Sequence, residues 1–146
     1  KQHCLNAEKT VEYLSKHKNV ARVIYPTKYD GEIGKRAKKY LKGGYGGLVG
    51  IELKGGIEAG KKFIEALKMF YHVANIGDAR SLAIHPGSTT HSQLNEKELL
   101  AAGVTPGYVR LAIGIEHIDD IIEDLEQALN RASDNIENIK KAKAVG

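Results

Sequence analysis

The sequence predicts an α+β fold: a two-layer sandwich in which a small mixed, mostly antiparallel sheet carries helices packed on one face. Helical and β-branched stretches interleave along the 146 residues. Some strand connections, such as residues 76–81, are too short for the crossover helix that a parallel pair needs, so some pairs must be antiparallel. Because no repeat or low-complexity linker divides the chain, we expect a single domain, 1–146.

The helices follow from apolar residues that recur at steps of three and four. They are expected over residues 4–17, 32–41, 57–69, 95–102 and 118–143. Gly43-Gly44 ends the second helix, and Asn95 can cap the fourth. The last helix has the strongest pattern, with an acidic first turn and lysines at its end.

The strands follow from short β-branched or alternating stretches bounded by turn residues. They are expected over residues 20–25, 45–53, 70–76, 81–85 and 108–113. Pro26 ends the first strand, and the glycines that dilute the second indicate a close neighbour. The third and fourth strands are joined through a turn at Gly77-Asp78.

Composition excludes several classes of protein. The chain contains no apolar run of the roughly 20 residues that a membrane helix needs and no secretory signal, so we expect a cytoplasmic protein without membrane contact. Cys4 is the only cysteine, which excludes an internal disulfide. The first residue is Lys1 rather than methionine, and we expect a fragment, a processed product or a trimmed chain.

Charge is distributed unevenly along the chain. Residues 1–70 carry 15 Lys+Arg and 7 Asp+Glu, whereas residues 71–146 carry 7 and 11. A basic helix over residues 32–41 could contact a polyanion, but no aromatic strand or glycine clamp accompanies it. We therefore expect no nucleic-acid binding.

Two glycine-rich stretches resemble phosphate-binding loops and are rejected. Residues 55–61 satisfy G-x-x-x-x-G-K, but Lys62 replaces the magnesium-binding hydroxyl, and Gly60 lies inside a helical pattern. Residues 43–47 lack the dinucleotide spacing. The six histidines show no metal-ligand spacing, so no metal site is expected.

Arg110 is the candidate binding residue. Alternation in the last strand puts Arg110 with Tyr108 on the face opposite the core, where a guanidinium can bind a carboxylate or merely face solvent. Asn75 can bind a ligand or cap its turn, and the hydroxyl of Thr90 can line a site or satisfy its own backbone.

Three motifs carry a resemblance to a known family. They are Asn75-Ile76-Gly77-Asp78-Ala79-Arg80-Ser81-Leu82-Ala83-Ile84-His85-Pro86-Gly87-Ser88-Thr89-Thr90-His91, Gly103-Val104-Thr105-Pro106, and Val109-Arg110-Leu111-Ala112-Ile113-Gly114-Ile115-Glu116-His117-Ile118-Asp119-Asp120. The chain resembles the C-terminal region of the pyridoxal-phosphate enzymes of Cys/Met metabolism, and within that family their O-acetylhomoserine sulfhydrylase branch.

The resemblance implies a fold, a reaction and a set of contacts. The fold is the small C-terminal domain of these enzymes, and the reaction is a γ-replacement in which O-acetylhomoserine loses acetate and sulfide or a thiol adds. Arg110 matches the arginine that grips the α-carboxylate of the amino-acid substrate. Asn75 matches a position beside it that is serine in related γ-lyases, the N–H of Ile76 completes the anion site, and Thr90 matches a nearby hydroxyl position.

The cofactor-binding residues of this family are absent from the chain. The resemblance implies that the lysine that holds pyridoxal phosphate lies in a Ser-x-x-Lys motif of a larger, preceding domain and not in the region that this chain matches. We therefore expect that this chain alone binds no cofactor and is inactive, that its partner is the missing large domain, and that the whole protein is a homo-oligomer, since family members form homotetramers. The alternative is a stand-alone basic binding module without catalysis.

Overall fold

The core of the molecule is a five-stranded sheet in the order β1-β2-β5-β4-β3. The computed structural model describes residues 1–89, 96–101 and 104–144. The strands are β1 (Val20–Ile24), β2 (Leu48–Leu53), β3 (Tyr71–His72), β4 (Leu82–Ile84) and β5 (Tyr108–Ala112). Only the pair of β3 and β4 is parallel, which confirms the predicted mixed, mostly antiparallel sheet.

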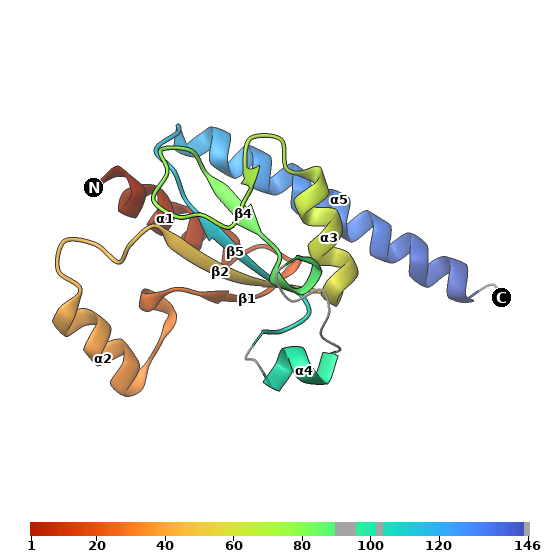
Figure 1. Ribbon diagram of the computed structural model, residues 1–146, viewed down its shortest axis with the longest axis horizontal. Coiled ribbons are helices and arrows are strands. Elements are labelled where there is room, and N and C mark those ends of the chain that lie inside the picture. Colours follow the sequence, from red (N-terminus) through yellow and green to blue (C-terminus); the bar gives the residue numbers. More distant parts are fainter. Residues whose placement is uncertain (90–95, 102–103, 145–146) are drawn as a thin grey trace.

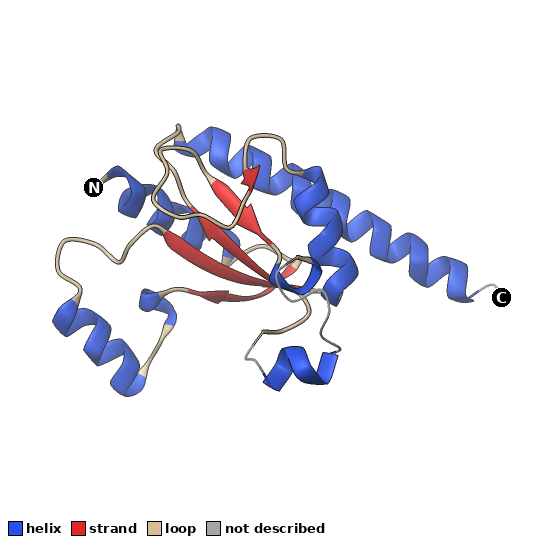
Figure 2. Ribbon diagram, viewed as in Figure 1, coloured by secondary structure: helices blue, strands red, loops and turns tan. Residues whose placement is uncertain are grey.

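Helices cover one face of this sheet (Figures 1 and 2). They are α1 (Gln2–Leu14), α2 (Gly31–Tyr40), α3 (Gly56–Ala66), α4 (Glu96–Ala101) and α5 (Ile118–Ala144), with two 3-10 turns, η1 (Pro26–Lys28) and η2 (Pro86–Ser88). α1, α3 and α5 form the second layer, whereas α2 stands away from it beside η1. The predicted α+β two-layer class is therefore confirmed.

The strict alternation of side chains along β2 and β5 creates the core. Val49 and Ile51 of β2 and Val109 and Leu111 of β5 are fully buried against the helices. The helices contribute the matching apolar stripes, at Ala7, Val11 and Leu14 of α1, Ala59 and Phe63 of α3, and Ile121, Leu125, Ala128 and Leu129 of α5. This packing leaves Arg110 on the opposite sheet face.

The predicted pair of strands over residues 70–76 and 81–85 is partly wrong. β3 is only two residues long and lies parallel to β4, and residues 73–81 form a loop between them. β3 and β4 can lie parallel without a crossover helix because β3 has only two residues. A loop is long enough to carry the chain back to the end of the sheet at which β3 begins. Gly77 adopts a left-handed conformation at φ +74° in this loop.

Two other elements are shorter than predicted for local reasons. β2 begins at Leu48 rather than Tyr45, because Gly44 and Gly46 adopt positive φ values of 141° and 89°. α3 ends at Ala66 rather than Met69. The chain turns there because the buried carboxylate of Asp124 on α5 accepts the N–H groups of Lys68, Met69 and Phe70 at 2.9, 2.8 and 3.2 Å.

The G-x-x-x-x-G-K match forms no phosphate loop. Gly60 and Lys61 lie inside α3, as predicted, and Gly60 is packed so closely on the imidazole of His85 that any side chain would collide with it. Among the residues with described structure, no helix is long and apolar enough to cross a membrane.

We predict that Asp124→Asn lowers the free energy of unfolding by about 2 kcal/mol, since hydrogen bonds to a charged acceptor contribute about 1.5–3 kcal/mol. The side-chain amide of the asparagine would place an N–H group where the carboxylate now accepts backbone N–H groups. Urea unfolding of the isolated chain measures the loss, with Glu123→Gln, an exposed site one residue earlier, as the control. Equal stability of the two variants would contradict this role of Asp124.

Candidate functional site

Arg110 lies at the centre of the sheet face that the helices leave uncovered. It pairs in register with Gly50 of β2 on one side and Ile84 of β4 on the other, and Ile24 of β1 follows Gly50 in the same row. None of these cross-strand neighbours is acidic. Glu52, two residues after Gly50 on β2, instead accepts hydrogen bonds from Arg22 at 2.8 Å and Thr105 at 2.9 Å.

The guanidinium of Arg110 has donors without acceptors. Its Nη2 donates to the backbone oxygen of Asn75 at 3.2 Å. Its Nε is buried and has no hydrogen-bond partner in the described structure. No ion pair joins Arg110 to a carboxylate within residues 1–89, 96–101 and 104–144. Unmet donors in a planar fork suit a bound carboxylate, because a guanidinium can contact both of its oxygens.

The loop of residues 73–80 brings Asn75 beside Arg110, the position that the resemblance implies for it. The contact is made by the backbone oxygen of Asn75, whereas its side-chain Oδ1 accepts the N–H of Ile76 at 2.9 Å. The N–H of Ile76 is therefore already engaged, and an anion can use it only if the amide of Asn75 moves. Thr90 lies outside the described residues. The ligand contacts assigned to these positions stay predictions.

A buried network fixes the end of this loop. The carboxylate of Glu116 accepts the N–H of Ser81 at 2.6 Å and its hydroxyl at 2.9 Å. The same hydroxyl oxygen accepts the N–H of Gly114 at 2.9 Å, and Asn6 of α1 donates to the carbonyls of Gly114 and Glu116. The β5-α5 turn, α1 and the start of β4 are thereby joined, and Asn75 is positioned relative to β5.

Tyr108 is a second polar side chain beside Arg110 that the sequence placed on this face without giving it a role. Its ring lies over Gly50, where a Cβ would stand 2.8 Å from Cε2 and 3.1 Å from the hydroxyl. Burial raises the pKa of Tyr108, and the nearby charge of Arg110 only partly offsets this. The phenol therefore stays a neutral hydrogen-bond donor. The signal in the sequence was the glycine that leaves space for the ring.

His85 connects β4 to the segments around the site. Its Nε2 lies 2.7 Å from the carbonyl oxygen of Pro106, and its Nδ1 lies 2.8 Å from the hydroxyl of Ser88. The hydroxyl of Thr89 donates to the His85 carbonyl at 2.9 Å. Because a carbonyl oxygen can only accept, Nε2 donates its hydrogen to Pro106. In the neutral ring Nδ1 then carries no hydrogen, and it accepts one from the hydroxyl of Ser88. Burial lowers the pKa of His85, which favours this neutral form.

Together these features make a surface that can bind an anion. Arg110 supplies the charge, and Tyr108 and the loop at Asn75 add polar groups around it. No cluster of three metal-ligating side chains occurs within the described part of the chain. Fold and site thus define a small α+β domain whose uncovered sheet face is suited to a carboxylate.

The chain belongs to the Cys/Met metabolism PLP-dependent enzyme family, whose model matches residues 1–130. It is 54% identical over 129 residues to O-acetyl-L-homoserine sulfhydrylase of Leptospira meyeri, covering 88% of this chain and 29% of that protein. It is 47% identical over 131 residues to homocysteine synthase of Schizosaccharomyces pombe (90% and 30%), and 45% identical over 130 residues to L-methionine gamma-lyase of Fusobacterium nucleatum subsp. polymorphum (89% and 33%). The chain thus spans about a third or less of these relatives.

A solved structure has the same fold. It is a protein of Campylobacter jejuni subsp. jejuni NCTC 11168 assigned as an O-acetylhomoserine (thiol)-lyase, with a TM-score of 0.79 and 42% identity over 88% of this chain and 31% of that one. That structure carries N'-pyridoxyl-lysine-5'-monophosphate at its position 205, outside the part that this chain matches. The family resemblance inferred from the sequence motifs is confirmed.

We predict that Gly50→Ala destabilises the isolated chain by about 1–3 kcal/mol, because the added methyl group overpacks against the Tyr108 ring. Tyr108→Leu should remove part of that cost, since it deletes the two colliding ring atoms, whereas the Cβ of Ile24 stays 3.1 Å from the added methyl group. A double-mutant cycle by urea unfolding measures the coupling. Additive effects of the two substitutions would show that the ring does not lie over Gly50.

We also predict a pH dependence that comes from His85. Its pKa is lower in the folded chain than the ordinary value of 6.5, so the unfolded state binds more protons and stability falls as pH drops below about 6.5. Burial also lowers the pKa of His17, so the contribution of His85 is read as a difference. His85→Gln should flatten the stability profile between pH 7 and 5 relative to the unmodified chain. Equal slopes in the variant and the unmodified chain would exclude the effect.

Proposed function

We propose that this chain is the substrate-carboxylate-binding part of a PLP-dependent enzyme that makes homocysteine from O-acetylhomoserine and sulfide by γ-replacement. The observation that carries the proposal is the Arg110 guanidinium, whose buried Nε has no acceptor and whose cross-strand neighbours are uncharged. The high identity to the Leptospira meyeri sulfhydrylase supports the reaction type.

Arg110 would bind the α-carboxylate of the amino-acid substrate and so fix its orientation. Tyr108 can donate a hydrogen bond beside it because its phenol stays neutral. Asn75 holds one guanidinium nitrogen in place through its backbone oxygen. These contacts would aim the reactive end of the substrate away from this sheet and toward the rest of the enzyme.

Pyridoxal phosphate supplies an electron sink for the chemistry when it is bound. The unmet donors of Arg110 fit the carboxylate of an amino acid, which is the kind of substrate that this cofactor serves. Cofactor contacts are expected from the larger domain, so this chain alone should bind none. In the whole protein the residues of this chain would bind and orient substrate and exclude water above the sheet.

A γ-lyase is the second candidate, because the chain is also 45% identical to an L-methionine gamma-lyase. Asn75 favours replacement over elimination, since serine is expected there in the lyases. A stand-alone polyanion-binding module has less support, because it gives the unpartnered Nε of Arg110 no role. Retention on a polyanion column that falls steeply with salt would favour the module.

We predict that a chimaera in which this chain replaces the matching region of the Leptospira meyeri sulfhydrylase forms homocysteine from O-acetylhomoserine and sulfide. Arg110→Lys in the chimaera should lower kcat/KM about 10- to 100-fold, chiefly by raising KM, because lysine cannot make the forked contact. Arg22→Lys, on the same sheet face but paired with Glu52, is the matched control.

The isolated chain serves as a second control. It should show no Schiff-base absorbance when titrated with pyridoxal phosphate and no turnover. The proposal fails if the chimaera is inactive although folded, if Arg110→Lys behaves like Arg22→Lys, or if the isolated chain binds the cofactor covalently. Methanethiol released from methionine faster than homocysteine is formed would favour the lyase instead.

A further inference from the structure

The loop of residues 73–80 supplies the hydrogen-bond acceptor that the structure describes for the Arg110 guanidinium, but the loop itself buries little. Residues 73–77, 79 and 80 are exposed, and Asp78 is half-buried. The acceptor is the backbone oxygen of Asn75, which lies 3.2 Å from Nη2 of Arg110. The position of this oxygen therefore depends on the path of the loop backbone, and apolar packing of the loop cannot determine that path.

Contacts inside the loop give it shape but do not tie it to β5. The carboxylate of Asp78 accepts the backbone N–H of Arg80 at 3.0 Å, and the Arg80 guanidinium lies 4.2 Å from the ring centroid of Tyr71 on β3. Tyr71 and Arg80 are both exposed, and exposed contacts of this kind contribute little. The groups that fix the loop relative to β5 must therefore lie at its ends.

The C-terminal end of the loop is tied to the turn between β5 and α5. Oε1 of Glu116 accepts the N–H of Ser81 at 2.6 Å, and Oε2 accepts the Ser81 hydroxyl at 2.9 Å. The N–H of Ile115 donates to the carbonyl oxygen of Ala79 at 2.8 Å. The two segments lie so close that a Cβ at Gly114 would collide with the Glu116 carboxylate and the Ala79 oxygen. Glu116 is therefore the side chain that holds the loop against the turn.

The turn that carries Glu116 is itself fixed to α1. The side-chain amide of Asn6 donates to the backbone oxygens of Gly114 and Glu116 at 3.1 and 2.9 Å. Asn6 is 1% exposed and Ser81 is fully buried, so water has little access to these hydrogen bonds. A charged acceptor in such surroundings forms strong hydrogen bonds. A continuous set of contacts thus runs from α1 through the turn and the loop to the oxygen that contacts Arg110.

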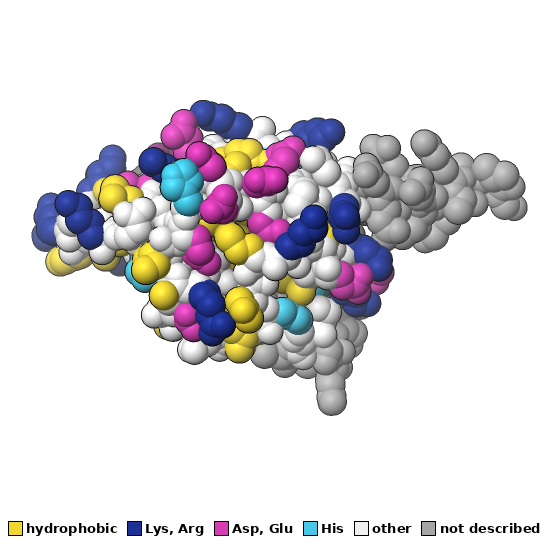
Figure 3. Space-filling view, turned by 90° about the horizontal axis from the view of Figure 1, so that it is seen from above, with side chains coloured by type: hydrophobic (Ala, Val, Ile, Leu, Met, Phe, Trp, Pro, Cys, Tyr) yellow, Lys and Arg dark blue, Asp and Glu magenta, His cyan; other side chains and the backbone are white. Residues whose placement is uncertain are grey.

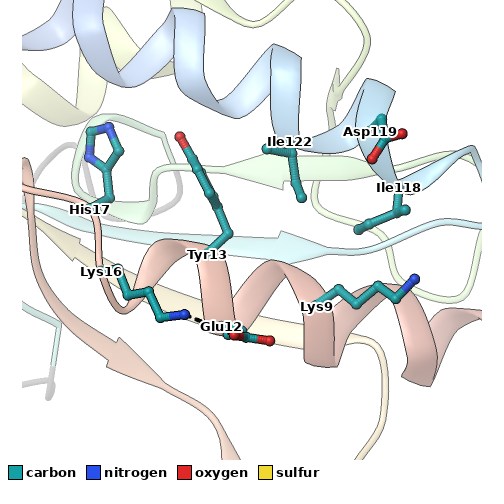
Figure 4. Close-up of a pocket in the computed structure, with 8 residues that line it drawn as sticks. All are labelled: Lys9, Glu12, Tyr13, Lys16, His17, Ile118, Asp119 and Ile122. Carbon is teal, nitrogen blue, oxygen red and sulfur yellow. Dashed lines mark hydrogen bonds and ion pairs between the residues drawn. The ribbon is translucent and has the colours of Figure 1, made fainter.

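Other acids near the start of α5 lie in different surroundings. Figure 3 shows acidic side chains gathered over the start of α5, and Asp119, Asp120 and Glu123 are exposed, whereas Glu116 is half-buried. Acids in a first turn favour a helix through its dipole, but Glu116 lies before Ile118, where α5 begins. Asp119 lines a hollow of about 520 Å³ between α1 and α5 (Figure 4). It is a matched control for Glu116, because in the described structure its carboxylate binds no residue of the loop.

We propose that Glu116 is a positioning residue for the amino-acid substrate: by holding Ser81, it places the Asn75 carbonyl where it orients the Arg110 guanidinium toward the α-carboxylate. The inference rests on the proposed function, since it names what orients the carboxylate-binding arginine. Glu116 acts through the loop and not by contact with the substrate. Without it the loop and the guanidinium sample several positions, and a carboxylate has to order both on binding, which weakens its affinity.

Kinetics of the chimaera with the Leptospira meyeri sulfhydrylase test this role. Glu116→Ala should lower kcat/KM for O-acetylhomoserine about tenfold, chiefly by raising KM, because the hydrogen bonds of a charged acceptor are lost. Glu116→Gln should lower it less, since the amide oxygen still accepts the N–H of Ser81. kcat/KM for sulfide should stay unchanged in both variants, because sulfide has no carboxylate for Arg110 to bind. Loss of folded enzyme would lower both values together, so the difference between the two substrates is specific for positioning.

A double-mutant cycle and two controls separate positioning from stability. In the Arg110→Lys background, Glu116→Ala should change kcat/KM less than about twofold, since the forked contact that the loop orients is already gone. Asp124→Asn also removes a carboxylate that accepts backbone N–H groups, but those groups lie at the end of α3, so KM should stay unchanged. Asp119→Ala removes an exposed carboxylate three residues after Glu116 and should have no effect on KM either.

NMR spectra of the isolated chain give a readout that does not need turnover. The backbone ¹⁵N signals of residues 74–76 and the Nε–H signal of Arg110 should shift in Glu116→Ala and stay in place in Asp119→Ala. The proposal is overturned if these signals do not shift, if Glu116→Ala and Arg110→Lys act additively on the activation free energy, or if Asp124→Asn raises KM as much. If Arg110→Lys has no effect on the chimaera, the proposed function fails, whereas the spectra still decide whether Glu116 positions the loop.

Discussion

The arrangement of the site depends on one half-buried, hydrogen-bonded carboxylate, that of Glu116. It binds the N–H and the hydroxyl of Ser81, and through that hydroxyl it reaches the N–H of Gly114. Ser81 is completely buried, so loss of these partners would leave polar groups unsatisfied away from water. Because the loop of residues 73–80 ends at Ser81, this interaction determines where Asn75 lies above β5.

The charge of Arg110 gains its importance from what surrounds it. The charge of an arginine on an exposed sheet face usually contributes little to stability, since water screens it and nearby carboxylates neutralise it. Here the cross-strand neighbours are Gly50 and Ile84, and Glu52 is already held by Arg22 and Thr105. The guanidinium therefore keeps binding capacity for a ligand, and the neutral phenol of Tyr108 adds a donor without competing for the anion.

Periodicity predicted the class of fold, each α-helix of the described residues and the faces of β5, because burial on one side imposes a regular pattern on the sequence. It failed at β3, where only two residues pair and the loop that follows is held by contacts to Glu116, thirty-five residues after Ser81. The predicted helix also ran past Ala66. The helix ends there because Asp124 accepts the backbone N–H groups of residues 68–70, and a contact with a residue so far along the chain leaves no pattern in the sequence around Ala66.

The candidate site was predictable only in part for the same reason. The face of Arg110 follows from alternation, and its likeness to a substrate-binding arginine follows from the motif. That the N–H of Ile76 is engaged by Asn75, and that Tyr108 lies over Gly50, depends on side-chain packing that spacing does not encode. The register of a sheet aligns residues of strands that are distant in the sequence, and one sequence alone gives no direct signal for that alignment.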